Sequence, residues 1–143
     1  MPLPWLASKP LWLAAFLAWA AYLFMLSSNP ESVTEGAPQI PHIDKILHFG
    51  YFMGGAGLFT TWLLLLKGPQ SRSAIRIILP LVILCALAAL DEIQQSLSPG
   101  RSGNDPIDWL ADAVGSVTGM LLANRFHFIL RKISSPLPQK SQN

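Results

Sequence analysis

Four long apolar stretches, separated by segments rich in proline, glycine and charge, dominate the pattern of hydrophobic and polar positions. Including polar residues at their ends, they cover approximately residues 11–28, 46–66, 74–91 and 106–130. A helix needs about 20 predominantly apolar residues to cross the hydrocarbon core of a bilayer. The pattern therefore predicts an all-α, polytopic bundle of four transmembrane helices, forming one membrane domain over 1–143 with a short polar tail at 134–143.

Local signals mark some of the helix ends. Asp105 followed by Pro106 predicts the start of the fourth helix, because an N-cap carboxylate accepts free backbone N–H groups and proline has none to leave unsatisfied. Pro80 is expected to kink the third helix. The first stretch also resembles a signal peptide, since Lys9 precedes an apolar run. No clean small-x-small cleavage site follows Leu26, so we interpret this stretch as a membrane span.

The composition agrees with a membrane protein. Hydrophobic residues make up 51% of the chain and charged residues only 13%, with a mean hydropathy of +0.39. The formal net charge is only +2, and the basic residues are scattered beside apolar runs, so we exclude nucleic acid as a partner. A single cysteine, Cys85, excludes an internal disulfide and a multi-cysteine metal site. Its apolar surroundings favour a small core residue.

The distribution of charge predicts the orientation. Lys and Arg near span ends are retained on the cytoplasmic side. The N-terminus, the loop between the second and third spans and the C-terminal end together contain eight of the ten basic residues and none of the eight acidic ones. These eight are Lys9, Lys67, Arg72, Arg76, Arg125, Arg131, Lys132 and Lys140. We therefore expect both termini to be cytoplasmic.

With this topology, the start of the second span, the end of the third and the start of the fourth meet at the extracytoplasmic face. Polar residues are concentrated there in three pairs. The two members of each pair are four residues apart, which places them on the same face of their helix. The pairs are Asp44 with His48, Asp91 with Gln95, and Asp108 with Asp112. Glu92, Lys45 and Arg101 lie beside them in the sequence. Carboxylates at membrane depth are costly and need partners, so we expect an outward-facing polar pocket.

Several roles fit these residues. Lys45 and Arg101, together with the positive ends of two helices, are expected to contact an anionic group. Glu92 is the candidate acid and His48 the candidate base. The other polar residues would form the floor of the pocket. A divalent cation held by Asp44, His48, Glu92 and Asp108 is an alternative, although the spacing matches no known metal motif. The identity of any metal or cofactor is left open. A buried ion-pair network that only fixes helix packing is another alternative.

Two small-xxx-small patterns lie in the second and fourth spans. They are Gly50 with Gly54, and Gly115 with Gly119. Small residues at this spacing allow two helix backbones to approach closely. We expect the second and fourth spans to pack tightly within one chain, with a dimer contact as the alternative.

Four motifs follow one another between residues 44 and 119: Asp44-Lys45-Ile46-Leu47-His48-Phe49, Asp91-Glu92-Ile93-Gln94-Gln95, Pro99-Gly100-Arg101-Ser102, and Asp108-Trp109-Leu110-Ala111-Asp112 running on to Gly119. Together they resemble the VanZ-like family of membrane proteins, whose pattern often has Asn in place of Asp112. The resemblance implies a small multi-pass protein of the bacterial cytoplasmic (inner) membrane. The name-giving member is linked to low-level resistance to the glycopeptide teicoplanin. The resemblance names a class and supplies no reaction.

These observations support three functions. The first is a cell-envelope protein that lies in the lipid bilayer and binds an anionic group at the extracytoplasmic face, on a lipid-linked cell-wall precursor or another anionic lipid. The second is a membrane enzyme that hydrolyses or transfers a group on a lipid carrier. The third is a small proton-coupled transporter. The four spans do not form two repeated halves, which argues against this function.

Overall fold

The computed structural model describes residues 3–28, 42–72, 74–98, 103 and 105–134. Within these residues every regular element is a helix, as predicted. The elements are η1 (Pro4–Ala7), α1 (Lys9–Ser28), α3 (Ile43–Lys67), η2 (Ala74–Ile78), α4 (Leu79–Leu97) and α5 (Pro106–Ser134). Four helical segments, with η2 and α4 counted as one, are long and apolar enough to cross a membrane.

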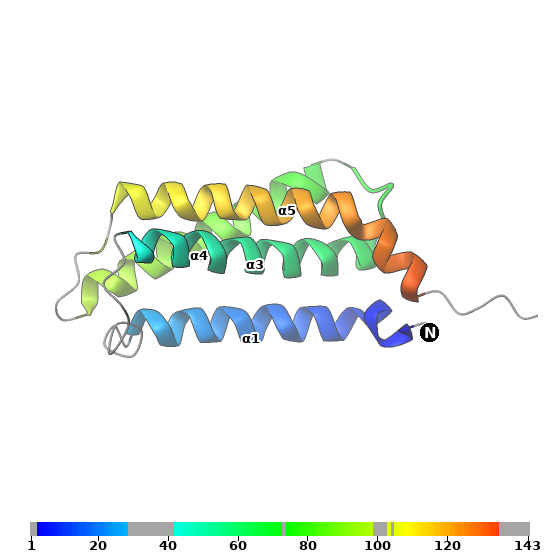
Figure 1. The fold of residues 1–143 in the computed structure, drawn as a ribbon, viewed down its shortest axis with the longest axis horizontal. Coiled ribbons are helices and arrows are strands. Elements are labelled where there is room, and N and C mark those ends of the chain that lie inside the picture. The colour runs from blue at the N-terminus through cyan, green and yellow to red at the C-terminus, as the bar shows by residue number, and fades with distance from the viewer. Residues whose placement is uncertain (1–2, 29–41, 73, 99–102, 104, 135–143) are drawn as a thin grey trace, which may run out of the picture.

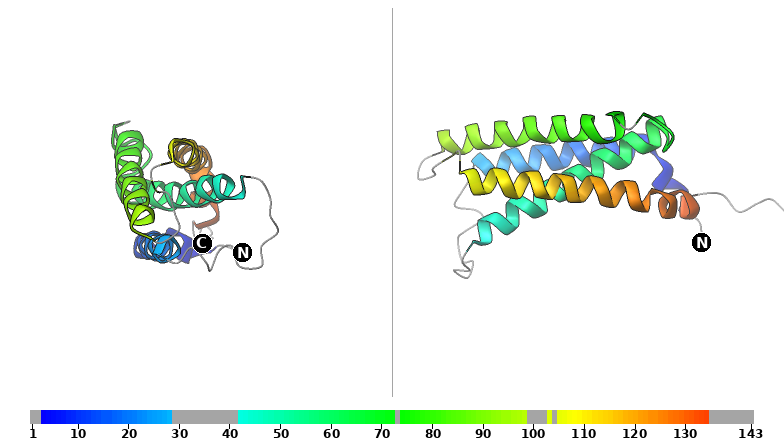
Figure 2. Two further views of the ribbon diagram at one scale, coloured as in Figure 1. Left: turned by 90° about the vertical axis from the view of Figure 1, so that its left-hand side faces the viewer. Right: turned by 90° about the horizontal axis from the view of Figure 1, so that it is seen from above.

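The helices alternate in direction along the bundle (Figure 1). The start of α3, the end of α4 and the start of α5 therefore lie at one end, and the end of α1 lies there too. The start of α1 and the end of α5 lie at the opposite end. The two further views show that α3 runs obliquely to the other helices (Figure 2). This arrangement agrees with the predicted convergence of polar residues at one end, while the side of the membrane that they face stays a prediction.

Close packing of α3 against α5 is achieved by two glycines of α5. A Cβ atom at Gly115 would collide with the carbonyl oxygen of Phe49, and one at Gly119 with that of Met53. The prediction for α5 is therefore confirmed. The prediction for α3 is wrong, because no atom of the described part of the chain lies within 4 Å of a Cβ at Gly50 or Gly54. On α3 the contacting positions are one residue earlier, which corresponds to about 100° around a helix.

Aromatic side chains fill the space between α1 and α3. The rings of Phe16 and Phe59 have centroids 4.9 Å apart, and Trp19 packs edge-on against Phe52. A Cβ atom at Gly55 would collide with the Trp19 ring, so this glycine makes room for the indole. The aromatic contacts dock α1 on the bundle through apolar burial and ring geometry.

The outer surface of the bundle is apolar, as expected for helices in lipid. Leu97 on α4 and Leu110 on α5 are 80% and 62% exposed. Cys85 is also exposed, so its interpretation as a core residue is wrong. The buried positions of α4 nearest to Cys85 are Leu84 and Ala88. Cys85 lies one residue past Leu84, about 100° around the helix, and so faces outward.

The third span begins with a π-helical turn, η2, which ends two residues before Pro80. Proline lacks a backbone N–H group and disturbs the regular hydrogen-bond pattern, which accounts for an irregular turn at this point. At the other end α4 continues to Leu97, past the predicted limit at residue 91. The change from apolar to polar residues ends the apolar stretch but not the helix. Asp91, Glu92 and Gln95 therefore all lie on α4.

Candidate functional site

A polar cluster occupies the end of the bundle where α3 and α5 begin and α4 ends. We define this polar cluster as Asp44, Lys45, His48, Glu92, Asp105, Asp108 and Asp112. Four of its side chains are buried, namely those of His48, Glu92, Asp108 and Asp112. Burial of so many ionisable groups is costly unless they pair with one another or with a ligand.

Lys45 is surrounded by carboxylates. Its Nζ atom lies 2.6 Å from Asp105 Oδ2, 2.8 Å from Asp44 Oδ2 and 2.8 Å from Asp108 Oδ1. A lysine ammonium group has three protons to donate, and three carboxylates surround this one. The contacts of Lys45 therefore do not favour its expected role as a direct contact for an anion.

Asp105 both starts a helix and pairs with Lys45. Its Oδ1 atom accepts a hydrogen bond from the backbone N–H of Ile107 at 2.8 Å, which confirms the predicted N-cap of α5. Its other oxygen accepts from Lys45. The Lys45 ammonium group and, to a smaller extent, the Ile107 N–H hold the pKa of the Asp105 carboxyl below its usual range. The sequence identified the cap and missed the ion pair.

His48 is held by two aspartates of α5. Its Nδ1 atom lies 2.9 Å from Asp112 Oδ1, within hydrogen-bond distance. Its Nε2 atom lies 3.9 Å from Asp108 Oδ2, which is too long for a direct hydrogen bond. A buried carboxylate therefore orients the imidazole ring and turns Nε2 toward the remaining acidic groups.

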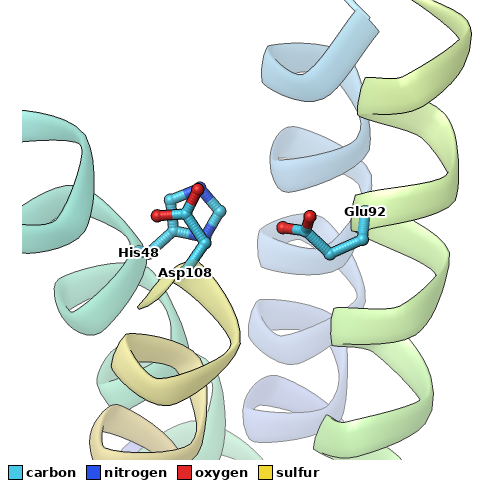
Figure 3. A group of neighbouring side chains, drawn as sticks. All are labelled: His48, Glu92 and Asp108. Atoms are coloured by element: carbon cyan, nitrogen blue, oxygen red, sulfur yellow. The ribbon is translucent and has the colours of Figure 1, made fainter. Parts of the chain in front are cut away.

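Glu92 reaches the polar cluster from α4. Its side chain is 3% exposed, and Oε2 accepts a hydrogen bond from the backbone N–H of Asp105 at 3.2 Å. The Glu92 carboxyl points across toward His48 and Asp108 (Figure 3). Gly103 allows this approach, because a Cβ there would collide with the backbone of α4 at Glu92 and Ser96. One ligand atom from each of His48, Glu92 and Asp108 lies within 4.8 Å of the others.

Asp91 and Gln95 form a neighbouring pair that connects α4 to α1. Gln95 Nε2 donates to Asp91 Oδ2 at 2.8 Å, and the hydroxyl of Ser27 donates to Asp91 Oδ1. Sequence reasoning assigned the pocket to the second, third and fourth spans and so missed Ser27 of α1. A polar pair, Ser27 and Ser28, at the end of an otherwise apolar stretch is the signal that points to this contact.

An apolar cavity of about 190 Å³ lies between α1 and α4 and reaches Asp91. Its lining consists mainly of leucines and other apolar side chains, including Leu23, Leu87 and Leu90. This cavity places an apolar surface next to the Asp91–Gln95 pair. One further predicted site residue, Arg101, lies outside the described residues.

Comparisons with known proteins give no match: no family model, curated protein or solved structure is significantly similar to this chain. The structure shows four helices able to span a membrane and a buried polar cluster at one end of their bundle. The VanZ-like resemblance and the roles of the candidate residues stay predictions.

Proposed function

We propose that this chain is a multi-pass protein of the bacterial cytoplasmic membrane that binds the anionic polar group of a lipid-linked or cell-wall molecule. One observation carries the proposal. A buried polar cluster lies at the end of a bundle whose outer surface is apolar. A ligand with a polar group in the polar cluster and an apolar tail in the lipid would match both surfaces.

Two further observations support this proposal. The cavity between α1 and α4 offers an apolar surface beside Asp91, suited to a hydrocarbon chain. Three of the motifs that resemble VanZ-like proteins, around Asp44, Asp91 and Asp108, come from the three helices that meet at the polar cluster. The resemblance adds susceptibility to teicoplanin-type glycopeptides as a property to measure in cells.

The charge of the polar cluster decides how an anion can bind. Five carboxylates surround one lysine and one histidine in its described part, and the three nearest carboxylates already engage Lys45. An anionic group therefore needs an additional positive charge. The N-termini of α3 and α5 supply only partial charges.

Binding of a polyprenyl phosphate to the full chain in detergent tests the proposal. We expect the phosphate to raise the melting temperature with saturation and the uncharged polyprenol of equal length to have little effect. His48→Gln is expected to weaken the response. His127→Gln is the matched control, because His127 lies on α5 toward the opposite end of the bundle. A melting temperature that polyprenyl phosphate leaves unchanged over a wide concentration range would contradict the proposal.

The His48–Asp112 pair favours a second candidate, a membrane enzyme that hydrolyses or transfers a group on a lipid carrier. An imidazole oriented by a buried carboxylate is a recurring arrangement for proton transfer. In this function His48 and Glu92 act as base and acid. Purified protein is expected to convert labelled polyprenyl phosphates or diphosphates, and the His48→Gln variant to lose that turnover. No conversion with or without divalent metal would eliminate this candidate.

A further inference from the structure

Three side chains from three different helices converge within the polar cluster. His48 of α3, Glu92 of α4 and Asp108 of α5 are all buried, and one ligand atom from each lies within 4.8 Å of the others. Figure 3 shows the Glu92 carboxyl pointing across toward the His48 ring and the Asp108 carboxyl. An imidazole with two carboxylates is a ligand set suited to divalent transition metals.

The orientation of His48 fits a metal ligand. A hydrogen bond from Nδ1 to Asp112 Oδ1, at 2.9 Å, leaves the lone pair of Nε2 available. Metal-binding histidines usually donate their other ring N–H to a carboxylate in this way. The 3.9 Å separation between Nε2 and Asp108 Oδ2 is too long for a hydrogen bond, whereas an ion between the two atoms would contact both.

The balance of charge is an independent argument. Lys45 is engaged by three carboxylates and so offers little additional positive charge to Glu92 and Asp112. Asp112 is 2% exposed, and its Oδ2 atom is buried without a hydrogen-bond partner among the described residues. A buried carboxylate oxygen of this kind is costly unless positive charge lies nearby. A divalent cation held next to His48 would supply that charge.

We propose that His48, Glu92 and Asp108 bind a divalent transition-metal ion, and that Asp112 positions the imidazole ring of His48. This inference deepens the proposed function and rests on it in one respect. The bound ion would provide the positive charge that joins the anionic group of the ligand to the carboxylates of the polar cluster. Divalent ions in proteins commonly connect carboxylates to phosphate oxygens in this manner.

A cobalt titration tests the metal site directly. The full chain, purified without a histidine tag and treated with chelator, is titrated with Co²⁺ while its visible absorption is recorded. We expect saturable bands that Zn²⁺ removes, and an affinity at least about 10-fold lower in His48→Gln and Asp108→Asn. Asp112→Asn is expected to lower the affinity by about 10–100-fold and to shift the bands, with all three ligands still present.

Control variants exclude other ligands. Cys85→Ala and His127→Gln remove the thiol and a histidine outside the polar cluster, and both are expected to leave Co²⁺ affinity unchanged. Should His48→Gln fail to fold, Glu92→Gln gives the same comparison with an unchanged side-chain volume. The metal site is overturned if the parent protein shows no saturable bands, or if the ligand variants bind Co²⁺ as tightly as the parent.

A second measurement separates this inference from the proposed function. Polyprenyl phosphate binding is compared in the presence of Co²⁺ and in the presence of chelator. We expect binding to be at least about 10-fold tighter with Co²⁺. Equal binding in chelator would overturn the metal bridge and leave the proposed function intact. Saturable Co²⁺ binding without any binding of the lipid phosphate would uphold the metal site and overturn the proposed function.

Discussion

At the scale of single residues, two charged side chains of the polar cluster are expected to affect the stability of the fold in opposite directions. Lys45 is the cation shared by Asp44, Asp105 and Asp108. Glu92 adds one more carboxylate to a region already rich in them. Removing the shared cation leaves like charges together, whereas neutralising one carboxylate reduces repulsion. The first residue is thus expected to stabilise the fold, and the second to be retained for binding.

Lys45→Met and Glu92→Gln test this difference. We expect Lys45→Met to destabilise the fold by about 1–3 kcal/mol, because Lys45 is partly exposed and only Asp108 among its three carboxylate partners is buried. Glu92→Gln keeps an oxygen for the Asp105 N–H and is expected to leave the melting temperature unchanged or raised. Thermal unfolding in detergent with chelator measures both, with Lys67→Met as the control. An equally large loss in Glu92→Gln would identify the polar cluster as a structural ion-pair network.

At the scale of the helices, the contact between α3 and α5 determines the geometry of the polar cluster. His48 lies on α3, and both of its aspartate neighbours lie on α5. Gly115 and Gly119 let the two backbones approach, which holds the imidazole at its observed distances. A change that separates these helices is therefore expected to affect both stability and binding.

Gly119→Ala and Gly54→Ala form a matched pair for this contact. A Cβ at position 119 would collide with the Met53 carbonyl oxygen, so we expect a loss of about 1–3 kcal/mol and weaker Co²⁺ binding. A Cβ at position 54 meets no atom of the described residues within 4 Å, so Gly54→Ala is expected to be neutral or stabilising by up to about 1 kcal/mol. Melting temperature and Co²⁺ titration check both. A larger loss in Gly54→Ala would instead support a contact between two chains.

At the scale of the whole molecule, the orientation in the membrane decides which ligands can reach the polar cluster. The polar cluster lies at the end of the bundle that holds the end of α4 and the start of α5. Eight of the ten basic residues are predicted to lie toward the other side. The positive-inside rule therefore predicts that the polar cluster lies at the extracytoplasmic face.

Cysteine labelling checks this orientation in a Cys85→Ala background. We expect a membrane-impermeant maleimide to label Leu97→Cys in intact cells, because Leu97 is 80% exposed at the end of α4. Gln70→Cys, exposed between α3 and η2, is expected to react only after the cells are permeabilised. The reverse pattern would place the polar cluster at the cytoplasmic face and exclude an extracytoplasmic cell-wall group as its ligand.

The sequence by itself determined the number of membrane-spanning helices, the N-cap at Asp105 and the end of the bundle where the polar residues gather. These features depend on local rules: apolar length, helix-end chemistry and the alternation of spans. The spacing of four between Asp44 and His48, or between Asp108 and Asp112, shows a shared helical face in any fold. For this reason the members of each pair, including Asp91 and Gln95, could be assigned to a shared helical face before any helix was positioned.

Only the tertiary structure decided which partner each polar group takes. Lys45 engages Asp105 as well as Asp108, Asp91 turns to Ser27 of α1, and His48 lies between two aspartates of α5. These choices depend on how each helix is rotated about its axis, and one residue changes that rotation by about 100°. The same rotation turns Gly50 and Gly54 away from α5. Contacts between distant segments carry no local signal, so the sequence predicts a polar site and the packing of the helices determines its chemistry.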